Sequence, residues 1–339
     1  MPCRLAVVLL PMLALSVPIA GAAAATPAPR EVSVGVYLLD ITRIDETANQ
    51  FSCEADVRVR WRDADLAFDP DSTGVARLVY SGAEAREQHG RIWTAQIAPT
   101  NPVGGLTVGG EKLVVSPDGA VELTARIATT LRANLDFRQF PFDSQVLPLQ
   151  MESFSWNRDE VVLVSDDEFS GYEPMRALAE WSITGVEVVR SEELRVRDVV
   201  PYANLAYRFT VQRDAGYYVW KIFLTVAIIV ALTWVVFWMS GEGLGRRAGV
   251  SSGGILSVIA YQFVTSSSLP RVSYLTVADK VMILSIVVIA LTMLESLVVD
   301  RWSVTAPERK LAVDRACRVA FPVVYFGMLV VLGAAKGVL

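Results

Sequence analysis

The residues whose types and spacing suggest a chemical role lie in residues 248–269, a stretch without a single charge. Its 22 residues are enough for a helix to cross a hydrocarbon core of ~30 Å at about 1.5 Å per residue. Its many serines and glycines make it too polar to face lipid all round, and polar groups in a membrane helix usually face a bundle interior or water. Steps of four and three residues mark one helical face, which carries Gly249, Gly253, Leu256, Ala260, Phe263 and Ser267.

The chemistry that such a face could perform is ion conduction. If several copies surround a common axis, the face lines a conduit with apolar constrictions at Leu256 and Phe263. A narrow ring of leucines excludes water, and a small tilt of the helices widens the ring enough to rewet it. The alternative is a polar helix buried among its neighbours, and this stretch alone is compatible with both.

The remainder of the chain offers no catalytic constellation. The single histidine, His89, lies in the polar run 84–90 and is best explained as a solvated loop residue. Metal-ligand spacings, a glycine-rich phosphate loop and a nucleophile motif are all missing from the sequence, and a net charge of −5 does not suggest a nucleic-acid partner. We therefore expect no enzyme, no cofactor and no metal site; a membrane-anchored hydrolase is disfavoured by the scarcity of histidine.

Four apolar segments define the membrane elements. They predict helices over 218–239, 248–269, 276–299 and 316–338, within a transmembrane domain of residues 217–339. Residues 1–25 have the charged start, apolar run and small-residue end of a secretory signal peptide.

Basic residues in the short loops set the orientation. Arg246 and Arg247 lie between the first two helices, and Arg301, Arg309 and Arg315 lie between the last two. The positive-inside rule places both loops in the cytoplasm, in agreement with a cleaved signal peptide. We expect a multi-pass protein of the bacterial inner membrane with its N-terminal domain in the periplasm.

Residues 26–216 form the exported domain, and they read as β-structure. Short alternating runs such as 31–39, 53–61 and 120–127 are separated by Pro-, Gly- and Asp-containing turns, which predicts a sandwich of two antiparallel sheets. The last strand passes into the first helix with hardly a break, which favours a domain that moves the helices. The predicted fold is thus an α+β membrane protein, a β-sandwich followed by a four-helix transmembrane bundle. Cys53 and Cys317 are not expected to form a disulfide.

Residues 135–145, LDFRQFPFDSQ, carry a family resemblance. Phe140, Pro141, Phe142, Asp143 and Gln145 match the signature loop of the pentameric ligand-gated ion channels. Ala133 and Leu147 stand where animal members have the two bracketing cysteines, so this chain resembles the members without the Cys pair.

Further motifs follow in the family's order. Trp61-Arg62-Asp63, the arginine Arg213 before the first helix, and Leu269-Pro270-Arg271 with Tyr274 after the pore helix all resemble family motifs. The runs 152–156, 217–220 and 320–322 are most similar to those of the Erwinia-type bacterial channels. Together the motifs cover nearly the whole mature chain.

The resemblance implies a homopentamer in a lipid bilayer that conducts monovalent ions. A small-molecule agonist would bind outside, between adjacent subunits, and Leu256 would form the gate. The signature loop, with Phe140 and Pro141, would press on the loop that contains Pro270, and Asp143 would pair with Arg213. Without the resemblance these two would read as separate surface charges. The alternative is a sensor or scaffold of the same architecture that does not conduct.

The resemblance also implies a ligand site. Glu152 and Phe154 match an acid and an aromatic that contact ligand in the Erwinia-type channel, and Tyr202 matches an aromatic on its capping loop. Trp156 and Tyr207 lie near enough in sequence to contribute, and aromatic faces attract ammonium groups. We expect an amine, but not the same ligand, because Ala98 replaces a second ligand-binding glutamate and the capping loop is shorter. The alternative is that Phe154 and Trp156 are ordinary sheet packing.

The predicted cytoplasmic mouth contains Glu242, Arg246 and Arg247. Cation-selective family members have a glutamate directly before the basic residue that opens the pore helix, and here that position is Arg246. Two rings of arginine would favour anions electrostatically. Against this, an arginine can point away from the lumen, and the resembling bacterial channels conduct cations.

Overall fold

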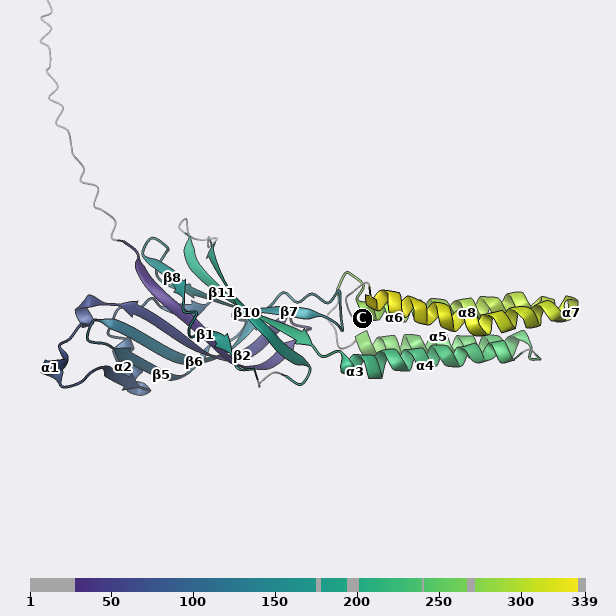
Figure 1. The fold of residues 1–339 in the computed structure, drawn as a ribbon, viewed down its shortest axis with the longest axis horizontal. Helices are drawn as coiled ribbons and strands as arrows, with labels where there is room; N and C mark the ends of the chain where they lie inside the picture. Colours follow the sequence, from purple (N-terminus) through teal and green to yellow (C-terminus); the bar gives the residue numbers. More distant parts are fainter. Residues whose placement is uncertain (1–27, 175–177, 194–200, 240, 267–271, 335–339) are drawn as a thin grey trace, which may run out of the picture.

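A computed structural model describes residues 28–174, 178–193, 201–239, 241–266 and 272–334. It has a β-sandwich followed by four long apolar helices, arranged end to end along one axis (Figure 1). The fold class expected from the sequence is confirmed. The predicted signal peptide 1–25, together with Ser267 and Pro270, lies outside the described residues.

The sandwich has a larger and a smaller sheet. The larger follows the order β3-β5-β6-β2-β1-β8, with β9 also paired to β1, and the smaller follows β10-β11-β7-β4. The strands of the larger sheet are β1 (Arg30–Asp45), β2 (Gln50–Arg62), β3 (Leu78–Ser81), β5 (Thr107–Val115), β6 (Ala120–Arg132), β8 (Val161–Ser165) and β9 (Gly171–Tyr172). Those of the smaller sheet are β4 (Ile97–Pro99), β7 (Ser144–Ser153), β10 (Trp181–Glu193) and β11 (Tyr202–Arg213).

Alternation of side chains builds the core between the sheets. In β2, every second residue from Phe51 to Trp61 is buried, because successive side chains of a strand point to opposite faces. The short helices α1 (Pro70–Thr73) and α2 (Ala83–His89) and a 3₁₀ turn at Ala64–Leu66 lie on connections between strands. His89 thus ends a short surface helix.

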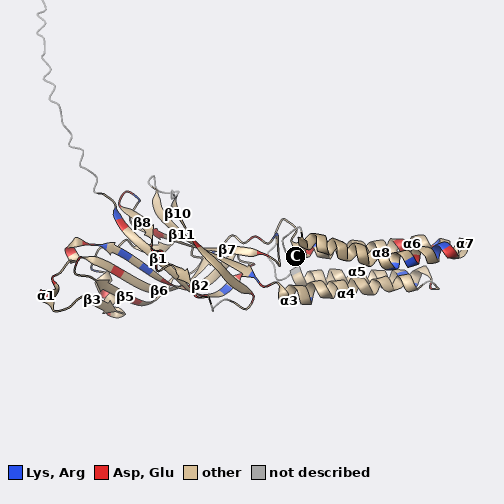
Figure 2. Ribbon diagram, viewed as in Figure 1, with Lys and Arg blue, Asp and Glu red and all other residues tan. Residues whose placement is uncertain are grey.

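Four helices have the length and apolar composition to cross a membrane. The first span joins α3 (Gly216–Tyr218), a π-helical segment (Val219–Phe223), α4 (Leu224–Thr233) and a 3₁₀ turn (Trp234–Trp238). The others are α5 (Leu244–Ser266), α6 (Val277–Asp300) and α8 (Pro307–Ala334), with α7 (Trp302–Thr305) between the last two. Charged residues are sparse along the helices and gather toward the α7 end (Figure 2), as expected for spans that end at a membrane surface.

Two of these helices begin earlier than hydropathy predicts. Helix α5 begins at Leu244 rather than 248, and α8 begins at Pro307 rather than 316. Apolar content delimits only the part of a helix that suits lipid, and polar turns can extend it. The extension of α5 places Arg246 and Arg247 inside the helix rather than in a loop.

Candidate functional site

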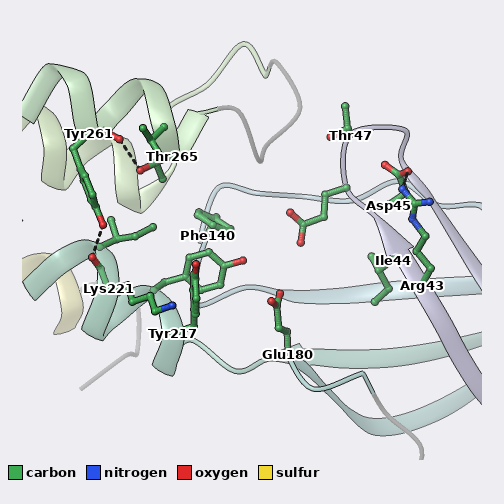
Figure 3. Close-up of a pocket in the computed structure, with 14 residues that line it drawn as sticks. Arg43, Ile44, Asp45, Thr47, Phe140, Glu180, Tyr217, Lys221, Tyr261 and Thr265 are labelled. Carbon is green, nitrogen blue, oxygen red and sulfur yellow. Dashed lines mark hydrogen bonds and ion pairs between the residues drawn. The ribbon is translucent and has the colours of Figure 1, made fainter. Parts of the chain in front are cut away.

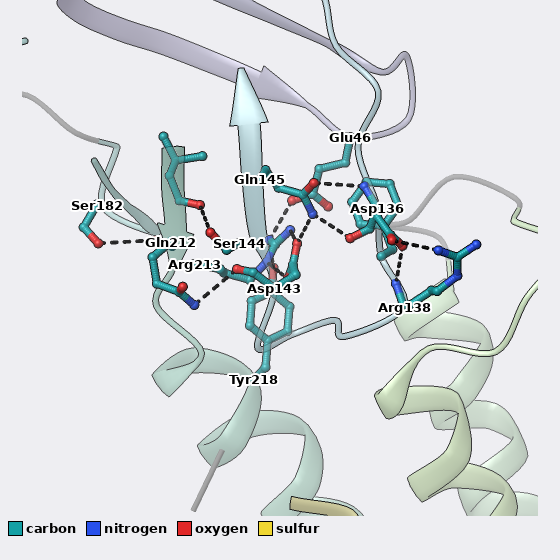
Figure 4. A network of polar contacts seen from close by, with 12 residues as sticks. Glu46, Asp136, Arg138, Asp143, Ser144, Gln145, Ser182, Gln212, Arg213 and Tyr218 are labelled. Atoms are coloured by element: carbon teal, nitrogen blue, oxygen red, sulfur yellow. Dashed lines mark hydrogen bonds and ion pairs between the residues drawn. The ribbon is translucent and has the colours of Figure 1, made fainter. Parts of the chain in front are cut away.

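The junction between sandwich and bundle is built around a buried ion pair. Arg213, the last residue of β11, donates from Nε to Asp143 Oδ1 at 2.8 Å and from Nη2 to Asp143 Oδ2 at 3.3 Å (Figure 4). Its Nη1 lies 2.6 Å from Oε1 of Glu46 in the β1–β2 turn. Gln145 Nε2 donates to Asp143 Oδ2 at 2.5 Å. The pair expected from the resemblance is therefore present, with a second carboxylate that the sequence did not indicate.

Burial and charge act in opposite directions on this cluster. Burial alone would lower the pKa of Arg213, but the Asp143 and Glu46 carboxylates outweigh it and raise that pKa. Burial raises the pKa of the Glu46 carboxyl above its ordinary value, and the attraction of Arg213 only partly offsets this. Trp181 covers the guanidinium at 4.2 Å from its ring centroid. A positive charge is thus held in a largely apolar setting by two acids.

The signature loop touches the bundle directly. The Phe140 ring packs edge-on against Tyr218 with centroids 4.8 Å apart, and the Phe140 carbonyl accepts from Ala278 N of α6 at 3.2 Å. Phe137 N donates to the Tyr274 hydroxyl at 3.0 Å. Pro141 is buried next to these contacts. The loop therefore joins the sandwich to the first and third spans.

A cavity of about 450 Å³ lies beside this junction (Figure 3). It is bounded by the β1–β2 turn, by Phe140, and by the outer ends of the first span and α5. At its membrane side the carbonyl of Lys221, in the π-helical segment, accepts from the hydroxyls of Tyr261 and Thr225. Tyr261 thus ties α5 to the first span at the level where the sandwich meets the bundle.

The face of α5 that the sequence singled out is uncovered in the subunit. Gly249, Gly253, Leu256, Ala260 and Phe263 are all exposed, and the two large side chains expose 67% (Leu256) and 76% (Phe263) of their surface. The opposite face packs against the other helices through buried residues, namely Arg247, Ser251, Gly254 and Val258. The predicted stripe is one continuous face, available to other subunits or to a pore.

The three residues of the predicted mouth lie differently from one another. Arg246 is exposed and donates to Glu242 Oε1 at 2.8 Å. Arg247 is 1% exposed and points into the bundle, with Nη2 at 2.8 Å from Asp314 Oδ1 and 3.1 Å from Glu295 Oε2. The expectation that Arg247 contributes a ring of positive charge to the mouth does not fit this position, because its charge is paired inside the subunit.

The predicted ligand residues Phe154 and Trp156 line a cavity of about 770 Å³ at the β4–β7 end of the sandwich. Trp61, Trp93 and Trp156 follow one another along it, with centroids 6.2 and 5.8 Å apart. Trp156 Nε1 donates to the Thr94 carbonyl at 2.9 Å, so this ring is fixed. Phe154 exposes 68% of its surface.

Three further predicted ligand residues lie on the two neighbouring strands β7 and β11. Glu152 is buried and lies opposite both Ala98 in β4 and Asn204 in β11. Tyr202, at the start of β11, is half-buried. Tyr207 is fully buried in the core, where its hydroxyl donates to the Val34 carbonyl at 2.5 Å, and burial raises its pKa to about 12. A ligand on the surface cannot reach Tyr207, so its assignment to the site is not supported.

Four polar residues at these sites were missed from the sequence. They are Glu46, Asn204, Glu295 and Asp314. Asn204 is 2% exposed, and neither atom of its amide has a hydrogen-bond partner. Glu295 did carry a signal, because it is the single charged residue in 281–299, and charges inside a membrane helix usually have a partner or a function.

Within the described part of the chain, no cluster of three or more His, Cys, Asp or Glu side chains could hold a metal ion. Both described cysteines, Cys53 and Cys317, are free thiols.

Comparison with known proteins identifies the family. Residues 22–215 match the family model of the neurotransmitter-gated ion-channel ligand binding domain. A proton-gated ion channel of Gloeobacter violaceus is 28% identical over 299 residues, which cover 88% of this chain and 80% of that protein. The human gamma-aminobutyric acid receptor subunit rho-2 is 26% identical over 298 residues, 86% of this chain and 62% of that one. A gamma-aminobutyric acid receptor subunit beta of Lymnaea stagnalis is 26% identical over 283 residues, 79% of this chain and 55% of that one.

The chain thus spans less than two thirds of the length of these two animal relatives. A particular likeness to Erwinia-type channels stays a prediction. The matched domain covers more than half of the chain, and four candidate spans follow it as in a multi-pass membrane protein. The chain belongs to the family of pentameric ligand-gated ion channels, whose members are ion channels and not enzymes.

Proposed function

We propose that this chain forms a homopentameric ligand-gated channel in the bacterial inner membrane, with its β-sandwich in the periplasm. Five copies of α5 surround the pore, and monovalent ions pass along the face from Gly249 to Phe263. A small ligand that carries an amine binds between adjacent sandwiches and opens the pore.

The observation that carries this proposal is the division of α5 into two unlike faces. The face that packs inside the subunit contains the charged Arg247 and the hydroxyl of Ser251, both buried. The uncovered face contains small residues and two large apolar ones, Leu256 and Phe263. A helix that simply faced lipid would show the reverse, with its polar groups inside and a continuous row of large apolar residues outside. An uncovered face with isolated apolar rings suits a gated water-filled pore.

The ligand class follows from the aromatic cavity and the acid next to it. Phe154 presents an open ring at the rim of the cavity, and Glu152 lies two residues away on the same strand. Ring faces and a carboxylate together attract an ammonium group. Asn204, opposite Glu152 in the sheet, adds an amide whose two polar atoms are available to a ligand. An amine with a second polar group fits this set, in line with the motifs that resemble the Erwinia-type channels.

Ligand binding would reach the pore through the junction. Strand β11 begins at Tyr202, beside the ligand residues, and ends at Arg213 in the buried ion pair. Asp143 and Phe140 of the signature loop then contact Arg213 and Ala278. A displacement of β11 therefore acts on α3 and α6 through direct contacts, without a flexible linker.

The test is electrophysiology of the purified, reconstituted protein. A panel of primary amines and amino acids is applied across a range of pH, with ion substitution on any current. We expect a ligand-dependent current that Phe154→Ala weakens. The absence of current under every ligand and pH, from protein that binds a ligand and assembles as a pentamer, would favour the non-conducting sensor or scaffold instead.

A further inference from the structure

Arg247 lies at the end of α5 where ions would enter or leave the cytoplasm, yet it faces away from the stripe. It precedes Gly249 by two residues, which correspond to about 200° around a helix. Its side chain is 2% exposed and points toward α6 and α8. The residue that the sequence places at the mouth is therefore on the far side of the helix from the pore.

Two acids on two other helices hold Arg247 there. Asp314 of α8 is fully buried and approaches Nη2 at 2.8 Å. Glu295 of α6 approaches the same nitrogen at 3.1 Å and is 9% exposed. Charge-assisted hydrogen bonds of this kind are strong, and a buried charge without a partner is costly. Lys310, one turn before Asp314 on α8, forms no ion pair among the described residues, so Arg247 is the cation to which Asp314 is bound.

The local charges then favour cations over anions. Arg247 contributes +1 and the two acids contribute −2, so the cluster carries −1 per subunit. At the exposed surface, the charges of Arg246 and Glu242 offset one another. The pairing removes from the mouth the positive ring that would repel cations.

The arrangement depends on the two carboxylates because the cluster is otherwise incompletely bonded. Arg247 Nε and Nη1 have no hydrogen-bond partner, and the nearby Ser251 Oγ has none either. Only Nη2 is fixed. Loss of an acid would leave a buried guanidinium with little to hold it, and the long side chain can then turn toward water.

We propose that Asp314 and Glu295 are specificity-determining positioning residues, which keep the channel permeable to cations by holding Arg247 out of the pore. The inference rests on the proposed channel function. It gives the peripheral helix α8, which lines no part of the pore, a defined effect on which ions pass.

The experiment measures the reversal potential of the reconstituted channel in asymmetric NaCl. In Asp314→Asn we expect a shift toward the chloride equilibrium potential, because the freed Arg247 adds positive charge to the mouth. Asp314→Glu keeps the carboxylate and should retain the wild-type reversal potential. In the Arg247→Gln background, Asp314→Asn should cause no shift, because no arginine remains to be released.

Two results would overturn the inference. One is a wild-type reversal potential in Asp314→Asn; the other is a shift of equal size with and without Arg247, which would mean that Asp314 acts by its own charge. If Asp314→Asn does not assemble, Glu295→Gln carries the same comparison while the shorter ion pair remains. A wild-type protein without current defeats the channel function itself, whereas a wild-type current with unchanged selectivity in these variants defeats only the inference.

Discussion

Gly254 of α5 faces Thr233 at the end of α4 so closely that a Cβ atom on Gly254 would lie 2.3 Å from Thr233 Cγ2. The same atom would meet two Ile289 carbons of α6 at 3.5 Å. Small residues allow membrane helices to approach one another in this way. The contact sets the distance between the pore helix and both of its neighbours.

Gly254→Ala should therefore destabilise the bundle. Overpacking of this kind typically costs about 1–3 kcal/mol, and we expect a lower midpoint for thermal loss of the pentamer, followed by size-exclusion chromatography. Gly253→Ala is the matched control, because a Cβ at Gly253 meets nothing within 4 Å. Equal stability of the two variants would contradict the close approach.

Phe154→Ala should weaken the agonist. A lost cation–π contact is worth roughly 0.5–2 kcal/mol, which corresponds to an increase of about 2- to 30-fold in the concentration for half-maximal current. Phe154→Tyr keeps the ring and should stay close to wild type, whereas Phe154→Leu keeps only the apolar volume and should behave like Ala. An unaltered dose–response curve in all three would place the ligand elsewhere.

Leu256→Ala should raise the resting or agonist-evoked current. The smaller side chain widens the apolar ring and lowers the barrier to pore hydration. Single-channel recording checks both the open probability and the conductance. Val331→Ala on the exposed face of α8 removes similar apolar volume away from the stripe and should leave the current unchanged. Wild-type currents in Leu256→Ala would argue against a gate at this position.

Glu46 should make stability depend on pH. Burial raises the pKa of its carboxyl above the ordinary value of 4.5, so the folded protein binds this proton more tightly than the unfolded chain. The resulting stabilisation is complete below that ordinary value and is lost as the pH rises through the folded-state pKa. Thermal unfolding from pH 4.5 upward measures the loss, which Glu46→Gln should abolish.

The control for this experiment is Asp45→Asn, next in sequence, whose carboxylate pairs with Arg43 at 2.7 Å. It should keep the pH dependence of the wild type. A pH profile that Glu46→Gln leaves unchanged would assign the dependence to other groups.

Patterns that depend on local periodicity could be predicted from the sequence. The stripe on α5 follows from helical spacing, and the buried alternation of β2 follows from strand spacing. The assignments that failed also had a local signal. Tyr207 has the same phase in β11 as the buried Leu205 and Phe209, and Arg247 is out of phase with Gly249.

Contacts between distant segments could not be predicted in the same way. Asp143 and Arg213 are separated by 70 residues, and only the family resemblance brought them together. Glu46 and Asp314 had no such guide, because their partners depend on how the β1–β2 turn and α8 pack. Burial decides both cases, and it is a property of the assembled fold.

Only Asp214 and Ala215 separate the end of β11 at Arg213 from the start of α3 at Gly216. A chimaera that joins this sandwich to the helices of another channel must therefore preserve that spacing. One inserted residue would rotate the incoming helix by about 100° and carry Tyr218 away from Phe140, so a splice designed by alignment alone would yield a receptor that still binds but no longer responds.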